Sequence, residues 1–319
     1  MTYVLLLVGF VLLMKGADFF VDGSSSVAKL LKVPPIIIGL TVVAFGTSMP
    51  EASVSITAAM RGENSLALSN ILGSNIFNLM IVLGCSALMR PISSSRQVVK
   101  RELPFSIAIT VLLALLCTKF SFGGLLDGNV SYQLGIGSGV LLLVLFGVFL
   151  VCQVRDGLKA RHEDDGEEYK TLSPVKSIVY IVGGLVAIVA GGNMVVESAT
   201  DIAVAFGFSQ SFIGLTIVAM GTSLPELVTS VVAAKKGENE LALGNVVGSN
   251  IFNILFILGA SAVLSPIAVE PNAIIDMAIL VVMSILAYIC TRTKKTLSKK
   301  EGVLFLIAYA VYFFYIYTR

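Results

Sequence analysis

Long apolar runs dominate this chain and limit the folds that are open to it. Of its 319 residues, 56% are hydrophobic and only 13% are charged. A spanning helix needs about 20 apolar residues, and a membrane-barrel strand about half as many with alternating polarity. The runs lie near residues 3–22, 34–58, 66–89, 104–122, 130–153, 174–197, 210–234, 241–265, 272–291 and 301–317. Since they are too long and too uniform for strands, we predict an all-α polytopic protein of the cell membrane with ten transmembrane helices.

The basic residues are distributed unevenly over the predicted loops. The odd-numbered connections hold 18 Lys and Arg, whereas the even-numbered connections and the two ends hold 3. Loops on the cytoplasmic side of a membrane carry the excess of Lys and Arg. The distribution therefore predicts cytoplasmic odd-numbered loops and extracellular termini. It also favours an even number of spans, because one missed helix would mix the two classes of loop.

Composition argues against several other classes of protein. The net charge of +2 gives no basis for nucleic-acid binding. The four cysteines lie far apart in or beside apolar runs, which indicates small buried side chains and neither a zinc site nor a disulfide framework. No basic segment precedes the first run, so we expect a retained span and no signal peptide. We expect no cofactor, no obligate protein partner and a monomer surrounded by lipid.

The chain contains an internal repeat at a fixed offset of 175 residues. Residues 39–92 match residues 214–267 at 32 of 54 positions without a gap. The match predicts a first five-helix repeat over 1–153, a polar cytoplasmic linker over 154–173 and a second five-helix repeat over 174–319. Because five is odd, the second repeat would enter the membrane from the opposite side. Transporters built from such inverted repeats bind their substrate near the midplane, between the repeats.

Each repeat carries the motif G-T-S-x-P-E inside an apolar run, at 46–51 and at 221–226. Proline removes a backbone donor and clashes with the carbonyl four residues earlier. In the first repeat this should free carbonyls around Ala44 to Thr47, and carbonyl oxygens suit a hard cation. Glu51 follows on the same helix face as the Thr-Ser pair. The corresponding residues are Ala44, Thr47, Ser48 and Glu51 in the first repeat and Ala219, Thr222, Ser223 and Glu226 in the second.

A second motif, G-S-N-I-F-N, occurs at 73–78 and at 248–253. Its serine and its second asparagine are four residues apart and therefore share a helix face. Its glycine should allow close approach of a neighbouring helix. These positions are Gly73, Ser74 and Asn78 in the first repeat and Gly248, Ser249 and Asn253 in the second.

Glu51 and Glu226 are the main candidate site residues. An intramembrane carboxylate costs about 3 kcal/mol on insertion scales, so two of them in duplicated motifs indicate function more than a structural hydrogen bond. The motifs offer carboxylate, hydroxyl, amide and carbonyl oxygens, which suit Ca²⁺, Mg²⁺, Mn²⁺ or alkali ions. Two ionised glutamates balance one Ca²⁺, and the same site could hold Na⁺ ions or two protons instead.

The two motifs resemble those of the sodium/calcium exchanger family of cation/Ca²⁺ antiporters. The resemblance covers the ten spans, both repeats and the short central linker, and the compact form is similar to the prokaryotic members. It implies that the second, third, seventh and eighth spans form a core. It also implies that the first and sixth spans are long, tilted and able to slide past this core for alternating access.

The resemblance further implies roles for individual residues. Glu51 and Glu226 would bind Ca²⁺ together with the main-chain carbonyls of Thr47 and Thr222. The flanking Na⁺ sites would be formed by Ser48, Ser74, Ser223 and Ser249 and by the carbonyls of Ala44 and Ala219, with Asn78 and Asn253 at the centre. Several relatives, potassium-dependent exchangers among them, carry Asp at the position of Asn253. With asparagine at both central positions, we expect a site with one negative charge fewer and no K⁺ co-transport.

The leading interpretation is a Na⁺/Ca²⁺ antiporter, and not an enzyme, that extrudes Ca²⁺ as Na⁺ enters. A H⁺/Ca²⁺ antiporter that uses the same two glutamates is the alternative. The chain has no G-x-x-x-x-G-K-[ST] loop, which argues against an ATP-driven pump. An intramembrane hydrolase with two carboxylates fits the duplicated Pro and Thr-Ser groups less well than ion binding does. A simple channel is a further possibility, which saturable counter-transport would exclude.

Two weaker features carry charge outside the motifs. Asp18 and Asp22 are one helical turn apart, and we expect interfacial polar residues there, with an ion entry route as the alternative. The acidic run at 163–168 lacks the ligand spacing of an EF-hand loop, so a solvated linker is favoured over a regulatory Ca²⁺ site.

Overall fold

The computed structural model describes residues 2–62, 64–95, 97–118, 133–162, 171–206, 219–294 and 296–318, and these residues are almost entirely helical, with η marking π-helical segments. The first half contains α1 (Thr2–Leu31), α2 (Pro35–Ile38), η1 (Gly39–Val43), α3 (Ala44–Thr47), α4 (Met49–Met60), α5 (Asn64–Phe77), η2 (Asn78–Val82), α6 (Leu83–Met89), β1 (Ile92–Ser93), η3 (Val98–Glu102), α7 (Leu103–Thr118), β2 (Gln133–Leu134) and α9 (Ile136–His162). The second half contains α10 (Pro174–Ala205), α12 (Ala219–Gly221), α13 (Leu224–Lys236), α14 (Asn239–Phe252), η5 (Asn253–Leu258), α15 (Gly259–Leu264), β3 (Ile267–Ala268), α16 (Pro271–Lys294), β4 (Thr296–Leu297) and α17 (Lys299–Thr318).

Most of the predicted spans are present as membrane-length helices. Among the described residues, eight helical segments are long and apolar enough to cross a membrane, and the bent pair Pro35–Thr47 and Met49–Met60 makes up to nine. The remaining predicted span, near 210–234, begins in residues outside the described ranges, and its described part is α12 and α13. The multi-pass helical architecture is therefore confirmed, while the count of ten spans stays a prediction.

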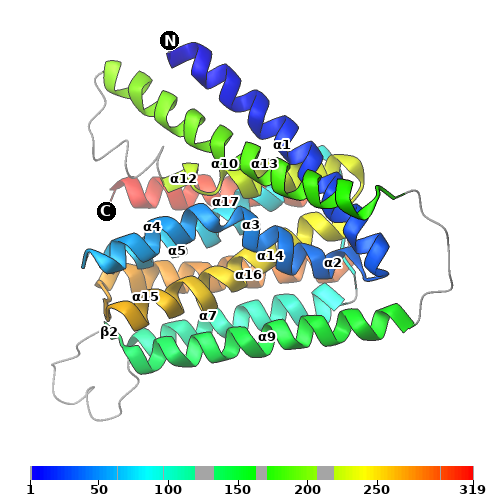
Figure 1. Cartoon of the computed structure of the whole chain (residues 1–319). Coiled ribbons are helices and arrows are strands. Elements are labelled where there is room, and N and C mark those ends of the chain that lie inside the picture. Colours follow the sequence, from blue (N-terminus) through cyan, green and yellow to red (C-terminus); the bar gives the residue numbers. More distant parts are fainter. Residues whose placement is uncertain are drawn as a thin grey trace.

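The helices form a body and an oblique arm (Figure 1). Most helices run side by side in the body, whereas α1 and α10 cross it at an angle and form what we call the arm. At 1.5 Å per residue, α1 with 30 residues and α10 with 32 are about 45–48 Å long, which exceeds a bilayer core of about 30 Å and suits a tilt. The chain termini lie at one end of the molecule, here called the termini end, and the α9–α10 connection lies at the other, the linker end.

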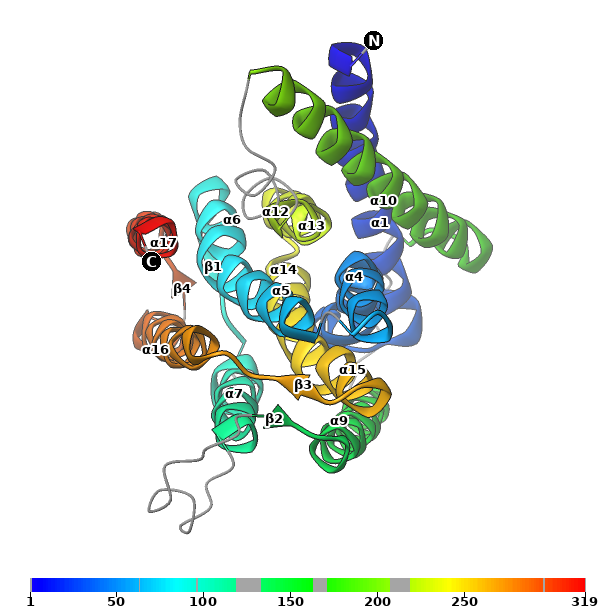
Figure 2. The ribbon, with the colours of Figure 1, turned by 90° about the vertical axis from the view of Figure 1, so that its left-hand side faces the viewer.

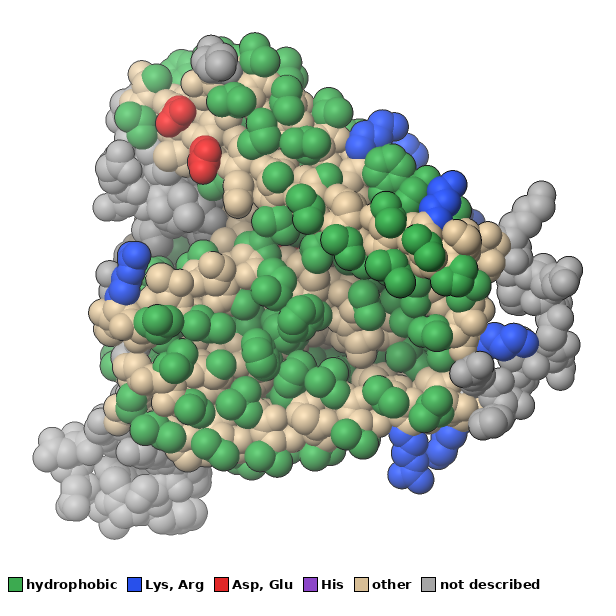
Figure 3. All heavy atoms as spheres, viewed as in Figure 1, with side chains coloured by type: hydrophobic (Ala, Val, Ile, Leu, Met, Phe, Trp, Pro, Cys, Tyr) green, Lys and Arg blue, Asp and Glu red, His purple; other side chains and the backbone are tan. Residues whose placement is uncertain are grey.

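The distribution of charged and hydrophobic side chains over the surface suits a protein that spans a bilayer. In the view of Figure 3, charged side chains gather toward the two ends, and hydrophobic side chains cover the band between them. The most buried spans are 66–89 and 239–264, which carry the G-S-N-I-F-N motifs. In their most apolar stretches 78% and 83% of the residues are buried, against 17–44% in the other six single-segment spans. Together with α4 and α13, which pack on α5 and α14, these spans form the centre of the body (Figure 2).

Glycines hold the two helices of the arm in close contact. A Cβ on Gly16 would lie 2.8 Å from the Gly184 carbonyl oxygen, and a Cβ on Gly184 would lie 2.7 Å from the Gly16 oxygen. Gly9 and Gly191 approach each other in the same reciprocal way, at 3.0 and 2.7 Å. Because hydrophobic burial gives little driving force inside a bilayer, such close packing of small residues is a main source of helix association. We therefore expect the antiparallel arm to move as one body.

The two halves of the chain are interleaved in space. Strand β1 pairs with β4 and β2 pairs with β3, both antiparallel. Helix α6 of the first half packs on α17 of the second, and α15 of the second packs on α9 of the first. Close glycines mark both contacts, since a Cβ on Gly302 would lie 2.8 Å from the Gly84 oxygen, and a Cβ on Gly139 would lie 2.7 Å from the Gly259 oxygen. Similar contacts thus recur with the halves exchanged, while the boundaries of the repeats stay predictions.

Helix α9 extends into the segment predicted as the linker. It continues to His162, so residues 154–162 are helical, while the boundaries of the linker stay a prediction. The segment V-R-D-G-L-K-A-R-H contains no proline, so nothing breaks the helix where its side chains become polar. The helix simply continues beyond the apolar layer. The acidic run at 163–168 lies outside the described residues.

The glycines that begin the two G-S-N-I-F-N motifs differ in how closely a neighbouring helix approaches them. A Cβ on Gly248 would lie 2.7 Å from the Cα of Leu40, so the predicted close helix approach is confirmed there. A Cβ on Gly73 would meet no atom within 4 Å, so the same prediction is wrong for the first repeat. Gly73 faces open space instead of a neighbouring helix.

The packing of the arm generates a direct test with a matched pair of variants. Gly184→Ala should lower the melting temperature, because its Cβ must push α1 away and overpacking costs about 1–3 kcal/mol. Gly183→Ala, next to it, has no atom within 4 Å of the new Cβ and should be neutral or stabilising, by up to about 1 kcal/mol of helix propensity. Thermal unfolding of both variants in detergent checks this, and equal melting temperatures would contradict it.

Candidate cation-binding site

Both G-T-S-x-P-E motifs interrupt their helices at the serine. The two parts of the bent span in the first repeat meet at 52°. Ser48 has φ −85° and ψ 10°, and Ser223 has φ −92° and ψ 7°, so the backbone leaves helical geometry at the same motif position in both repeats. Pro50 and Pro225 then lie in the first turn of the next helix, where a missing N–H is tolerated. The motif glutamates lie in the first turns of α4 and α13, where the helix dipole favours negative charge.

Each glutamate accepts a hydrogen bond from the serine of the other repeat. Ser48 Oγ donates to Glu226 Oε1 at 2.7 Å. Ser223 Oγ donates to Glu51 Oε1 at 2.8 Å. Ser249 Oγ makes a longer contact of 3.4 Å with Glu226 Oε1. The five side chains are fully buried, so the structure brings the two motifs together in the interior of the body.

Asparagines from both G-S-N-I-F-N motifs pair across the same centre. Asn78 Nδ2 donates to Asn250 Oδ1 at 3.2 Å, and Asn253 Nδ2 donates to Asn75 Oδ1 at 2.9 Å. Asn75 and Asn250 also donate to each other's main-chain carbonyl, at 3.3 and 3.2 Å. Asn78 and Asn253 each begin a π-helical segment, a rare geometry that is frequent at functional sites. Sequence reasoning gave no role to Asn75 and Asn250, although their presence in a duplicated motif was the available signal.

Five buried oxygen atoms around this centre have no hydrogen-bond partner among the described residues. They are Glu51 Oε2, Glu226 Oε2, Asn78 Oδ1, Asn253 Oδ1 and Ser74 Oγ. An unsatisfied buried polar atom is costly, and a charged one more so. The amide nitrogens of both asparagines are already used, so the unsatisfied amide atoms are acceptors. Oxygen acceptors of this kind are the ligands of hard cations, and the residues therefore fit Ca²⁺ or Na⁺.

The charge of the site comes from two carboxylates. Among the described residues, no group of three or more His, Cys, Asp or Glu side chains could hold a metal ion. A cation at the centre would thus be held by Glu51 and Glu226 together with neutral oxygens. Soft-metal chemistry, which needs thiolates or imidazoles, does not suit this donor set.

The backbone carbonyls before each break only partly follow the sequence expectation. The Ala44 oxygen accepts the Ser48 N–H at 3.1 Å, so the prediction that proline frees this carbonyl is wrong. Pro50 removes the bond to the carbonyl four residues earlier, and Ala44 is six residues away. The Thr47 hydroxyl also lies 3.5 Å from the Ala44 oxygen. In the second repeat the Ser223 N–H instead donates to the Met220 oxygen at 3.2 Å and not to the Ala219 oxygen.

The motif threonines occupy different surroundings. Thr47 is fully buried, and its hydroxyl contacts the Val43 oxygen at 3.1 Å and Asn245 Oδ1 at 3.0 Å. Asn245, another residue that sequence reasoning missed, also donates to Ser230 Oγ at 2.9 Å and so ties α14 to α13 and α3. The Thr47 hydroxyl is therefore held within the protein, which leaves its main-chain carbonyl for the role implied by the resemblance. Thr222 is half-buried and borders a pocket.

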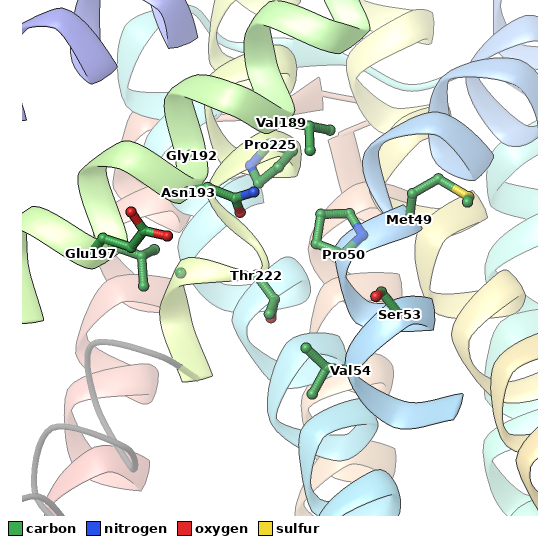
Figure 4. A pocket seen from close by; sticks show the side chains of 12 residues that line it. Met49, Pro50, Ser53, Val54, Val189, Gly192, Asn193, Glu197, Thr222 and Pro225 are labelled. Carbon is green, nitrogen blue, oxygen red and sulfur yellow. The ribbon is translucent and has the colours of Figure 1, made fainter. Parts of the chain in front are cut away.

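This pocket has a volume of about 490 Å³ and lies beside both motif prolines. Its wall includes Pro50, Pro225 and Thr222 from the motifs and Asn193 and Glu197 from α10 (Figure 4). Asn193 and Glu197 are exposed, so the pocket opens to the surface between the arm and the body. It gives a partly polar route from the surface to the motif residues.

Asp18 and Asp22 belong to α1 and contact the C-terminal end of α13. Lys236 Nζ lies 2.7 Å from Asp22 Oδ1 and 3.4 Å from Asp18 Oδ1. The structure therefore places them in ion pairs between helices and not beside the glutamates, while their position at the membrane interface stays a prediction.

Comparison with known proteins assigns the chain to a family. The family model described as sodium/calcium exchanger protein matches residues 1–155 and 176–318. The sodium/calcium exchanger MaX1 of Methanosarcina acetivorans is 33% identical over 349 residues, which cover 98% of this chain and 99% of MaX1. The inner membrane protein YrbG of Escherichia coli is 35% identical over 314 residues, covering 94% of this chain and 92% of YrbG.

A solved structure agrees in fold along nearly the whole chain. The sodium-calcium exchanger NCX_Mj, soaked with Na⁺ and Sr²⁺, superposes with a TM-score of 0.83 at 32% identity and covers 97% of each chain. The family resemblance seen in the duplicated motifs is thereby confirmed. This chain belongs to the sodium/calcium exchanger family, whose members are multi-pass membrane transporters and not enzymes.

Proposed function

We propose that this chain exchanges Na⁺ for Ca²⁺ across the cell membrane by alternating access, and that inward Na⁺ drives Ca²⁺ extrusion. As a family member the chain is a cation/Ca²⁺ antiporter, and the Na⁺ coupling and the direction are the specific parts of the proposal. The names of MaX1 and NCX_Mj, which describe sodium/calcium exchange, support Na⁺ as the coupling ion. The proposal includes ten spans in two inverted five-helix repeats with extracellular termini, on the evidence of the 175-residue repeat and the distribution of basic residues.

The proposed site assigns the two ions to overlapping groups of oxygen atoms. Glu51 and Glu226 bind Ca²⁺, with the main-chain carbonyls of Thr47 and Thr222. The Na⁺ ligands are Ser48, Ser74, Ser223 and Ser249 and the carbonyls of Ala44 and Ala219, with Asn78 and Asn253 at the centre. The observation that carries this assignment is the group of five buried, unpartnered oxygen atoms contributed by both repeats.

Competition for the same carboxylates is the physical basis of exchange. Two ionised glutamates carry a charge of −2, which one Ca²⁺ neutralises. Na⁺ ions at the serine oxygens use the same Glu51 and Glu226 oxygens, because three of the serines contact them directly. Without a cation, two carboxylates would face each other in a low-dielectric interior, which is strongly unfavourable. Movement between the two access states is therefore favoured only with cations bound, which couples the two ion fluxes.

Replacement of one glutamate tests the site. We expect Glu51→Gln to reduce Ca²⁺ uptake into Na⁺-loaded liposomes at least about ten-fold, because loss of a charged ligand exceeds the 1.4 kcal/mol that equals a factor of ten. Radioactive Ca²⁺ in Na⁺-free external medium measures the uptake. Glu102→Gln is the matched control, since Glu102 is also buried but accepts bonds from Gln153 at 3.1 Å, away from the motifs.

Binding can be separated from transport in the same pair of variants. Ca²⁺ should raise the melting temperature of the wild-type chain and of Glu102→Gln, because a ligand stabilises the state that binds it. It should not raise that of Glu51→Gln. Full Ca²⁺-dependent uptake and stabilisation in Glu51→Gln would contradict the assigned site.

The coupling ion is tested by changing what fills the liposomes. We expect Ca²⁺ uptake into Na⁺-loaded liposomes and only background uptake into choline-loaded liposomes at the same pH. Two protons would also neutralise the glutamates, so a H⁺/Ca²⁺ antiporter predicts a different result. Uptake that ignores Na⁺ and follows an imposed pH gradient would overturn Na⁺ coupling and leave the two-glutamate site intact.

A further inference from the structure

Ion pairs join the arm to the body near the linker end. Lys236, the last residue of α13, contacts Asp22 Oδ1 at 2.7 Å and Asp18 Oδ1 at 3.4 Å, and its Nζ donates to the Asp18 main-chain oxygen at 2.9 Å. Gly237, with φ +85°, ends α13 in a left-handed conformation and turns the chain toward α14. Lys236 thereby fixes α13 to one turn of α1.

The connection between α13 and α14, which contains Glu238, holds α1 at a second point. Glu238 Oε1 accepts a hydrogen bond from Ser25 Oγ at 2.6 Å and lies 3.6 Å from Lys29 Nζ. Lys236 and Glu238 therefore contact α1 from Asp18 to Lys29, over about three helical turns. The arm is closed onto the body along this stretch.

The arm is apart from α4 on the other side of the candidate site. There the 490 Å³ pocket lies between α10 and α4, while Val196 of α10 still packs on Gly221 at the start of the second G-T-S-x-P-E motif. Glu197 and Asn193 of α10 line the pocket with exposed side chains (Figure 4). In Figure 3 acidic side chains mark this side of the arm, above a basic side chain at the same end of the body.

The internal repeat relates these two ends. At the offset of 175 residues, Asp22 corresponds to Glu197 and Lys236 corresponds to Arg61, so both members keep their charge. Asp18 corresponds to Asn193. Arg61 caps the C-terminal end of α4, as Lys236 ends α13. The structure holds no ion pair between Arg61 and Glu197, both of which it describes.

We propose that Asp22–Lys236 and Glu197–Arg61 are two alternative latches, of which the first closes one access route in this state and the second closes the other route in the opposite state. The inference rests on the proposed alternating access and adds the residues that hold each state. In an inverted repeat, exchange of the two halves' conformations produces the opposite state, and the same exchange converts the contacts of Asp22 into those of Glu197.

The rigidity of the arm makes the latches mutually exclusive. Gly16 and Gly184 fix α1 and α10 to each other, so α10 cannot approach α4 while α1 stays fixed on α13. Each latch is an exposed ion pair and should change an equilibrium between states only about two- to five-fold. That is sufficient for a transporter, which must populate both states during each cycle.

The test follows the pocket with a thiol probe. Ser53 lines the pocket and is exposed, so Ser53→Cys should react with a maleimide in detergent when the pocket is open. In that background Lys236→Gln should slow the reaction about two- to five-fold, because the closed pocket becomes more populated. Adding Arg61→Gln should restore the rate, because the opposing latch is then lost as well. Lys235→Gln, one residue from the latch, is the matched control and should leave the rate unchanged.

Background labelling and folding are controlled in the same experiment. The chain without Ser53→Cys gives the contribution of its four native cysteines. The exchanged pair Asp22→Lys with Lys236→Asp, made together with Asp18→Asn so that Asp18 does not repel the new carboxylate, should recover the wild-type rate, which a merely unfolded variant could not do. An unchanged rate in Lys236→Gln, or no restoration by Arg61→Gln, would overturn the latch proposal.

Maleimide labelling of Ser53→Cys requires no ion transport. The experiments therefore distinguish a failure of the latch proposal from a failure of the proposed Na⁺/Ca²⁺ exchange. If Na⁺-driven Ca²⁺ uptake is present and the labelling rates do not shift, the latch is wrong and the proposed function stands. If the rates shift as expected and Ca²⁺ uptake is independent of Na⁺, the latch stands and the coupling ion is wrong.

Discussion

The rest of this structure depends on the burial of two carboxylates inside a membrane protein. Glu51 and Glu226 are fully buried, and each is held by a serine of the opposite repeat. Such groups are tolerated only with donors and cations around them. The helix breaks supply part of this environment, because each glutamate lies in the first turn of a new helix, where N–H groups and the helix dipole favour negative charge. The remaining unsatisfied oxygens are acceptors of the kind that suit hard cations.

The interleaving of the two halves follows from the same constraint. A site that needs one glutamate from each repeat cannot form unless the repeats pack directly against each other. The reciprocal serine–glutamate and asparagine–asparagine bonds make that contact specific at the centre. Outside the centre, close glycines join α6 to α17 and α15 to α9. Polar bonds thus fix the register of the interface, and small residues allow the helices to approach closely enough to make them.

Much of the fold could be predicted from the sequence because bilayer thickness and the repeat leave few choices. The helix breaks could also be located, since proline acts on neighbouring backbone groups. Predictions failed where the answer depended on three-dimensional contacts. Gly73 and Gly248 occupy the same motif position, yet only Gly248 meets a neighbouring helix. Asn75, Asn250 and Asn245 became recognisable as part of the centre only through their partners. Helix α9 continues to His162, into the predicted linker, because polar composition does not by itself end a helix.

The difference between the arm and the centre explains how one molecule can be both specific and mobile. The centre is joined by short, buried polar bonds that would be costly to break. The arm contacts the body through apolar side chains and, near the linker end, through partly exposed ion pairs, which contribute little each and can be exchanged. Internally the arm is held by glycine packing, which does not depend on its position over the body. In the proposed alternating access, motion of the arm would therefore change access while the oxygen atoms of the centre keep their arrangement.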